Sequence, residues 1–176
     1  MGNKSKAVNY SLQAGKASLS QFSNVEAIKH FAYDVNSIQD EKEFINVKIS
    51  ALDGLGDAYQ ANSMFKEAIE TFEILGDIGT GILRLRAFRK AMEPAFQLGD
   101  IASLKELIIK AEKYVAADRL EKARVLLSKG RIFTMQNKAA EALENFEAAL
   151  QVFGKEYSSW DTAWGLIGVG IRSPGL

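Results

Sequence analysis

The sequence predicts an all-α protein made of repeated pairs of antiparallel helices. Apolar residues recur at three- and four-residue spacings along the chain, whereas the strict alternation typical of β-strands is missing. Short polar turns rich in Asn, Ser and Gly interrupt these apolar stretches. A size pattern also returns: a Gly is followed twelve residues later by an Ala and four residues after that by a Phe, in Gly15–Ala27–Phe31, Gly56–Ala68–Phe72 and Gly130–Ala142–Phe146.

Nine helices are expected, and the polar turns set most of their boundaries. Asn, Ser and Gly cap helix ends or adopt a left-handed backbone, so each turn ends one helix and begins the next. Ser158 and Ser159 are expected to cap the final helix, and Pro174 follows its end. Pro94 lies inside an otherwise helical stretch and is expected to kink it. The turns within pairs are Ser20–Asn24, Ala61–Ser63, Gly99–Asp100 and Gln136–Lys138. The expected helices are 5–20, 24–37, 40–61, 64–76, 80–98, 101–116, 118–136, 139–153 and 158–171.

The repeated sizes have a physical interpretation. A Gly on the first helix of a pair lets the second helix approach closely, and the small Ala on that second helix is expected to pack against this Gly. Large residues such as Leu52, Tyr59 and Phe72 then fill the space toward the next pair. A weaker copy places Met92, Leu104 and Ile108 at the same offsets. One helical pair cannot bury its apolar face alone, so the copies are expected to stack, and residues 1–176 are expected to form one domain.

The best copy resembles the tetratricopeptide repeat. Its residues Leu52, Leu55, Gly56 and Tyr59, followed by Ala68 and Phe72, match that family's signature, and Trp164, Ile167 and Gly168 form a partial copy. The resemblance implies a right-handed superhelix of about four and a half helical repeats. The late Pro of the signature is absent, and the repeats are longer than the family's. They would span about 5–37, 40–76, 80–116, 118–153 and, in part, 158–171.

The first forty residues are similar to a narrower group. The phrase from Tyr10 to Gly15 and the phrase from Asn24 to Phe31 resemble the helical sensor arms attached to signal-transduction ATPases and multidomain regulators. This second resemblance implies an arm that senses a ligand and is linked to a nucleotide-binding or DNA-binding domain.

Composition excludes several classes of protein. The chain has 22 Lys and Arg against 22 Asp and Glu, and this neutral balance argues against a protein that coats nucleic acid. The absence of Cys removes disulfides, thiolate zinc sites and cysteine nucleophiles, and it fits a reducing compartment. No stretch approaches the ~20 apolar residues of a membrane-spanning helix. We therefore expect a soluble, cytoplasmic protein whose partner is neither nucleic acid nor membrane.

No constellation of a catalytic, metal or cofactor site stands out. His30 is the single imidazole and has no converging partner in the pattern. Asp53 and Asp57 stand one helical turn apart, but a hard cation needs six or more oxygen ligands. Gly15 and Lys16 resemble the end of a phosphate-binding loop that lacks its earlier Gly and its preceding strand. We expect no enzyme activity, no metal and no cofactor.

The tetratricopeptide resemblance also implies a concave groove lined by the first helix of each repeat. Four arginines would then converge on its middle, and Arg86 and Arg89 share a helix face because they are three positions apart. Guanidinium groups bind carboxylates bidentately, so an acidic or C-terminal peptide segment is the matching ligand. Alternatively, Asp53, Asp57 and Glu93 neutralise these arginines across neighbouring helices. The groove residues are Lys16, Asp53, Asp57, Gln60, Arg86, Arg89, Glu93, Arg124, Leu127 and Arg131.

The expected last helix carries an apolar stripe made of Trp160, Trp164, Ile167 and Ile171. A final helix without a pairing helix exposes a face that normally receives a neighbour. A homodimer or docking to another domain would cover this face, and folding back as a cap is the alternative.

These observations favour a non-catalytic protein-interaction module that presents a curved surface to a protein or peptide in a regulatory or signalling assembly. The alternative is the ligand-sensing arm of a larger signal-transduction ATPase or transcriptional regulator.

Overall fold

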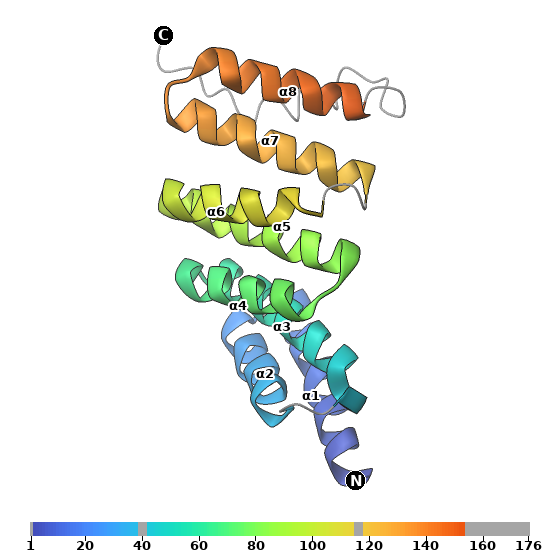
Figure 1. The fold of residues 1–176 in the computed structure, drawn as a ribbon. Helices are drawn as coiled ribbons and strands as arrows, with labels where there is room; N and C mark the ends of the chain where they lie inside the picture. The colour runs from blue at the N-terminus through green and yellow to red at the C-terminus, as the bar shows by residue number, and fades with distance from the viewer. Residues whose placement is uncertain (1, 39–41, 115–117, 154–176) are drawn as a thin grey trace.

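A computed structural model of the chain describes residues 2–38, 42–114 and 118–153. Within these ranges the fold is all-α, as expected, with eight α-helices, one short 3-10 helix at Lys42–Phe44 and no strand (Figure 1). The expected ninth helix at 158–171 lies outside the described residues. The α-helices are α1 (Gly2–Ser20), α2 (Asn24–Ser37), α3 (Ile45–Ala61), α4 (Phe65–Ile78), α5 (Gly81–Leu98), α6 (Ile101–Glu112), α7 (Arg119–Met135) and α8 (Ala139–Phe153).

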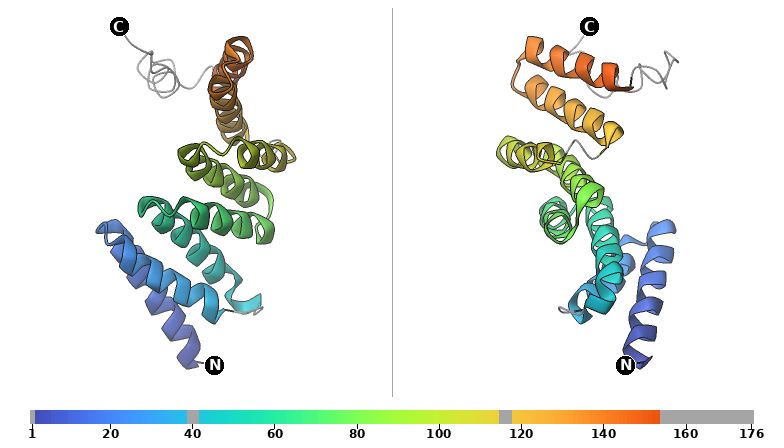
Figure 2. Two further views of the ribbon diagram at one scale, coloured as in Figure 1. Left: turned by 90° about the vertical axis from the view of Figure 1, so that its left-hand side faces the viewer. Right: turned by 45° about the vertical axis from the view of Figure 1, so that its right-hand side comes forward.

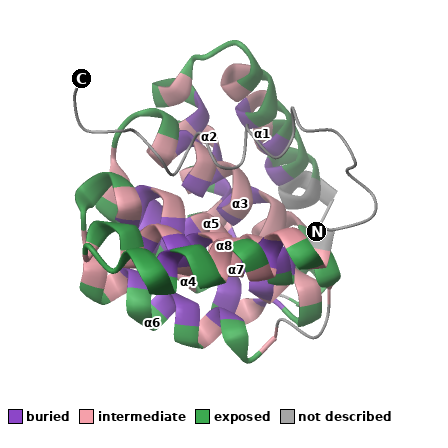
Figure 3. Ribbon diagram, turned by 90° about the horizontal axis from the view of Figure 1, so that it is seen from above, coloured by how far each residue is buried: buried purple, intermediate pink, exposed green. Residues whose placement is uncertain are grey.

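The helices follow one another as a stack of antiparallel neighbours, with α1 and α2 at one end and α8 at the other (Figures 1 and 2). Each helix packs against the next helix along the chain, α1 also contacts α3, and α5 also contacts α7. Seen along the stack, buried residues gather where the helices cross and exposed residues cover the outer faces (Figure 3). The odd-numbered helices α1 and α3, and likewise α5 and α7, therefore touch although an even-numbered helix separates them in sequence.

Two helix boundaries differ most from expectation. The helix expected from residue 40 begins as a 3-10 turn, and α3 starts at Ile45. That turn holds Phe44 against Val8 and Ile38 in a small buried cluster. The helix expected to reach residue 116 ends at Glu112. Pro94 does not interrupt α5, which is one continuous helix from Gly81 to Leu98 with Pro94 on its buried side.

The four turns within the helix pairs share one backbone geometry. Each contains one residue with a positive φ, and the next residue donates its N–H to the carbonyl five positions earlier, as in a Schellman helix end. The left-handed residues are Phe22 (58°), Ser63 (60°), Gly99 (67°) and Asn137 (58°). The hydrogen bonds are Ser23 to Ser18 (2.8 Å), Met64 to Tyr59 (2.9 Å), Asp100 to Ala95 (3.1 Å) and Lys138 to Phe133 (2.9 Å). The helix pairs therefore repeat the geometry of their turns as well as the sizes of their side chains.

Glycines on one helix pack directly against aromatic rings on another. A Cβ atom added at Gly15 would lie 2.7 Å from Cε1 of Phe31, closer than real side chains approach. We expected the Ala of each repeat to pack against its Gly. The Phe ring of the same repeat packs there instead, because the missing Cβ leaves room for a flat side chain. Two further contacts, at Gly54 and Gly76, were not anticipated from the sequence. The contacts are Gly15–Phe31, Gly54–Phe31, Gly56–Phe72, Gly76–Phe88 and Gly130–Phe146.

The apolar core is a series of interfaces between consecutive helices. Phe31 is fully buried in a cluster formed by α1, α2 and α3. A larger cluster continues from α3 to α7 around Phe72, Leu85 and Leu104, each with no exposed surface. Arg84 links α5 to the end of α4, because its guanidinium group donates hydrogen bonds to the carbonyls of Gly76 (2.8 Å) and Asp77 (2.9 Å).

One carboxyl is buried in the first helix pair without a hydrogen-bond partner among the described residues. Asp34 on α2 has no exposed surface, and neither of its side-chain oxygens accepts a hydrogen bond. The neighbouring Ser11 hydroxyl donates instead to the carbonyl of His30, at 3.0 Å. Burial raises the pKa of Asp34 to about 6.

We predict that Gly56→Ala destabilises the protein although Ala is the better helix former. The new methyl group collides with the Phe72 ring, and such overpacking costs about 1–3 kcal/mol of unfolding free energy. Urea unfolding followed by far-UV circular dichroism measures the loss. In a Phe72→Leu background the smaller side chain leaves space, so the same glycine substitution should cost clearly less. Equal costs in the two backgrounds would show that the ring is not what excludes the methyl group.

Asp34→Asn should stabilise the protein at pH 7, by about 1–3 kcal/mol, because it removes a buried charge without a partner. The folded pKa lies above the ordinary value of 3.8, so the folded chain binds more protons between pH 3.8 and about 6. The wild type should therefore lose stability relative to the variant as pH rises through that window. Urea titrations of both proteins across this range measure the difference, and a difference that does not vary with pH would contradict the assignment.

Candidate functional site

Nine charged residues of α3, α5 and α7 form ion pairs that link these helices, and this set is here called the charged face. It consists of Asp53, Asp57, Arg86, Arg89, Lys90, Glu93, Glu121, Arg124 and Arg131. Seven of these residues were expected in the groove, whereas Lys90 and Glu121 were not. The regular spacing of helical residues places them on one side of their helices, and the stacking of α3, α5 and α7 brings the three sets within ion-pair distance.

Lys90 connects α5 to α3. Its ammonium lies 2.6 Å from Asp53 and 2.7 Å from Asp57, and 4.9 Å from the centre of the Phe72 ring. Burial raises the pKa of Asp57, while the hydrogen bond from Lys90 opposes that shift. The paired carboxylates therefore hold a lysine. No group of three or more His, Asp or Glu that could hold a metal ion occurs in the part of the chain that the structure describes.

Glu121 is the centre of the α5–α7 contact. Its side chain is 1% exposed and lies 2.7 Å from Arg89 and 2.6 Å from Arg124, with Arg86 at 3.5 Å. Asp118 fixes the start of α7, because its carboxylate accepts the backbone N–H of Glu121 at 2.8 Å. A buried carboxylate with several charge-assisted hydrogen bonds is held firmly, so Glu121 sets the positions of the guanidinium groups around it.

Arg131 and Glu93 form a second tie between α7 and α5. Their closest atoms are 2.7 Å apart, and the guanidinium carbon of Arg131 lies 3.7 Å from the centre of the Phe96 ring. The hydrogen bond from Arg131 holds the pKa of Glu93 below its usual value, although partial burial acts in the opposite direction. Arg131 is thereby both paired and stacked.

The structure thus places internal ion pairs in the middle of the charged face. Of the three acids named for this alternative, Glu93 does pair with an arginine, but Asp53 and Asp57 pair with Lys90. Glu121, which meets three arginines, was missed. Its only sequence signal is its place one turn before Arg124, three residues after a helix-capping Asp.

The remaining expected groove residues do not join this network. Lys16 is exposed on α1, and Gln60 and Leu127 are half-buried on α3 and α7. Trp160, Trp164, Ile167 and Ile171 lie outside the described residues.

The arginine cluster still has unused hydrogen-bonding capacity. Three guanidinium groups face one carboxylate, so Glu121 neutralises only one of their three charges. Each guanidinium has five N–H donors, and only Nε of Arg89 and Nη1 of Arg124 hydrogen-bond to Glu121. The side chains of Arg86 and Arg124 are 54% and 41% exposed, so an anion from solvent can reach them. This arrangement fits the recognition of a carboxylate.

A scan of the chain against protein-family models gives no match, and a search of curated proteins gives none either. Among the residues described, no helix combines the length and the apolar character that crossing a membrane requires.

Glu121→Gln should lower the free energy of unfolding by about 2–4 kcal/mol, because it leaves three arginines around a neutral, largely buried side chain. Glu112→Gln is the matched control. It removes the same charge from an exposed pair with Lys129, and such surface pairs contribute about 0–1 kcal/mol. Chemical denaturation measures both losses. Similar small losses in the two variants would mean that Glu121 does not organise the α5–α7 contact.

Proposed function

We propose that the chain is a non-catalytic interaction module that binds an acidic segment, or a C-terminal carboxylate, of a protein partner on its charged face. The observation that carries this proposal is the cluster of Arg86, Arg89 and Arg124 around Glu121, in which the side chains of Arg86 and Arg124 are 54% and 41% exposed. The negative charge of Glu121 holds three positively charged side chains close together in the absence of a partner. The partner's carboxylates then supply the hydrogen-bond acceptors that one glutamate cannot.

The repeated geometry supports a tetratricopeptide-like superhelix as the scaffold. Four equivalent turns and five glycine–ring contacts recur along the stack, as expected if each pair of helices repeats the last one with a small rotation. In such a superhelix the odd-numbered helices line the concave side, and the charged face is the floor of its groove. We place the protein in the cytoplasm as a scaffold of a regulatory or signalling assembly.

One observation favours the second candidate function, the ligand-sensing arm of a larger signal-transduction ATPase or transcriptional regulator. An apolar cleft lies at the α6–α7 junction, on residues other than those of the charged face. A small molecule bound there would contact two helices of neighbouring pairs, which is where a sensor would alter the stack.

The groove hypothesis is tested with a fluorescently labelled ten-residue peptide of Glu and Asp and the double variant Arg86→Gln/Arg124→Gln. We expect binding to weaken at least tenfold in fluorescence anisotropy titrations, because both exposed guanidinium groups of the cluster are lost. The control Arg119→Gln/Lys122→Gln removes the same charge from exposed positions on α7 and should change the dissociation constant less than twofold.

Circular dichroism should show unchanged helicity in both variants. Equal weakening by the two double variants would mean that the peptide responds only to net charge. That result, or the lack of saturable binding to the wild type at low salt, would contradict the groove hypothesis.

A further inference from the structure

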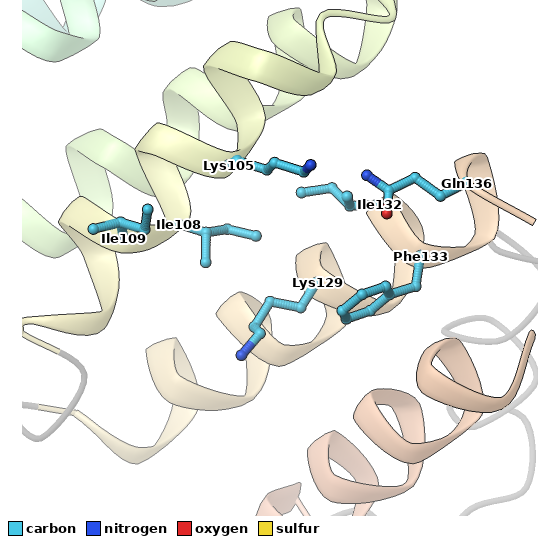
Figure 4. A pocket seen from close by; sticks show the side chains of 7 residues that line it. All are labelled: Lys105, Ile108, Ile109, Lys129, Ile132, Phe133 and Gln136. Carbon is cyan, nitrogen blue, oxygen red and sulfur yellow. The ribbon is translucent and has the colours of Figure 1, made fainter. Parts of the chain in front are cut away.

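An apolar cleft opens between α6 and α7 (Figure 4). Its space amounts to about 220 Å³, and its wall is almost entirely carbon. Ile108 and Ile132 form the floor and are 7% and 5% exposed, whereas Ile109 on the wall is 57% exposed. The lining residues are Lys105, Ile108, Ile109, Lys129, Ile132, Phe133 and Gln136.

Among the described residues, the α6–α7 junction lacks the contact that closes the other two junctions between pairs, and this difference accounts for the cleft. At the α2–α3 junction the Phe31 ring packs on Gly54, and at the α4–α5 junction the Phe88 ring packs on Gly76. At the α6–α7 junction the aliphatic Ile108 and Ile132 face each other instead. Ile108 also stands at the repeat position that Phe occupies in the other three copies. Two branched aliphatic side chains fill less space than a ring packed on a glycine, so a hollow remains.

The polar groups at the cleft have one sign of charge. None of the lining residues is acidic, and two are lysines. Lys129 is paired with Glu112 at 2.8 Å. Lys105 is exposed and has no hydrogen-bond or ion-pair partner among residues 2–38, 42–114 and 118–153. Figure 4 shows the Lys105 amino group and the Gln136 amide directed toward each other from the two helices.

These features select a class of ligand. An amine would meet the Lys105 ammonium and no carboxylate in the lining. A purely apolar compound would leave the Lys105 ammonium and the Gln136 amide unused. The volume is below the roughly 300–1,000 Å³ of drug-sized sites. It exceeds the about 150 Å³ of an apolar cavity that binds benzene. A short aliphatic chain that ends in one carboxylate meets all of these conditions.

We propose that the α6–α7 cleft binds a medium-chain aliphatic carboxylate. The chain lies on Ile108, Ile132 and Phe133, and the carboxylate accepts hydrogen bonds from the ammonium of Lys105 and the amide of Gln136. This inference deepens the ligand-sensing candidate and does not depend on the arginine cluster.

The test is equilibrium dialysis of radiolabelled octanoate against the full chain, at concentrations below those at which octanoate forms micelles. We expect saturable binding at one site, at least tenfold tighter than that of octan-1-ol or octylamine. Lys105→Glu should weaken octanoate binding at least tenfold, because it opposes the carboxylate with a like charge. Lys66→Glu, at an exposed position on α4, is the matched control and should change binding less than twofold.

A second variant tests the place of the ligand. Ile109→Trp adds a large ring to the exposed wall of the cleft and should block octanoate binding while circular dichroism shows unchanged helicity. Binding that survives Ile109→Trp or Lys105→Glu, equal binding of octan-1-ol, or no saturable binding would each overturn the proposal. The Arg86→Gln/Arg124→Gln variant should bind octanoate normally, and loss of binding there would place the ligand on the charged face instead. Because octanoate probes the cleft and the acidic peptide probes the charged face, failure of one proposal is distinguishable from failure of the other.

Discussion

The structure depends on one contact, an aromatic ring packed on a glycine of a neighbouring helix. The missing Cβ lets two helices approach until the ring fills the space between them, and a methyl group at any of these glycines would collide with it. The contact joins helices within pairs, as at Gly56 and Phe72, and between pairs, as at Gly76 and Phe88. It therefore fixes the spacing of neighbouring helices from α1 to α5 and of α7 and α8.

Both candidate sites follow from the presence or absence of this contact. The close approach of α3, α4 and α5 brings Lys90 within reach of two aspartates from α3, and Glu121 and Glu93 then tie α5 to α7. At the α6–α7 junction no ring packs on a glycine in the described chain, and the apolar cleft remains there. The helix α7 carries both features on different residues, with Arg124 on the charged face and Ile132 in the cleft.

Much of the fold could be predicted from the sequence because close packing requires small and large side chains at fixed offsets along the chain. Gly15, Gly56 and Gly130 predicted the close contacts, and the Asn, Ser and Gly turns predicted where most helices end. The ion-pair partners could not be predicted in this way. Which carboxylate meets Arg89 depends on the rotation and offset of a helix some thirty residues away, and Glu121 has no pattern of its own. For the same reason the contacts of Gly54 and Gly76 could not be predicted, because the rings that pack on them come from neighbouring helix pairs.

The most direct test of the stack is the distance between its first and last described helices. The chain has no native Cys, so spin labels can be attached to single cysteines placed at Gln13 on α1 and Glu144 on α8, both exposed. These helices lie at opposite ends of the stack (Figure 1). Double electron–electron resonance should therefore give a distance several times the about 8–10 Å that separate packed helices. A distribution centred near the packed value would mean that the chain closes into a bundle, and it would contradict the account.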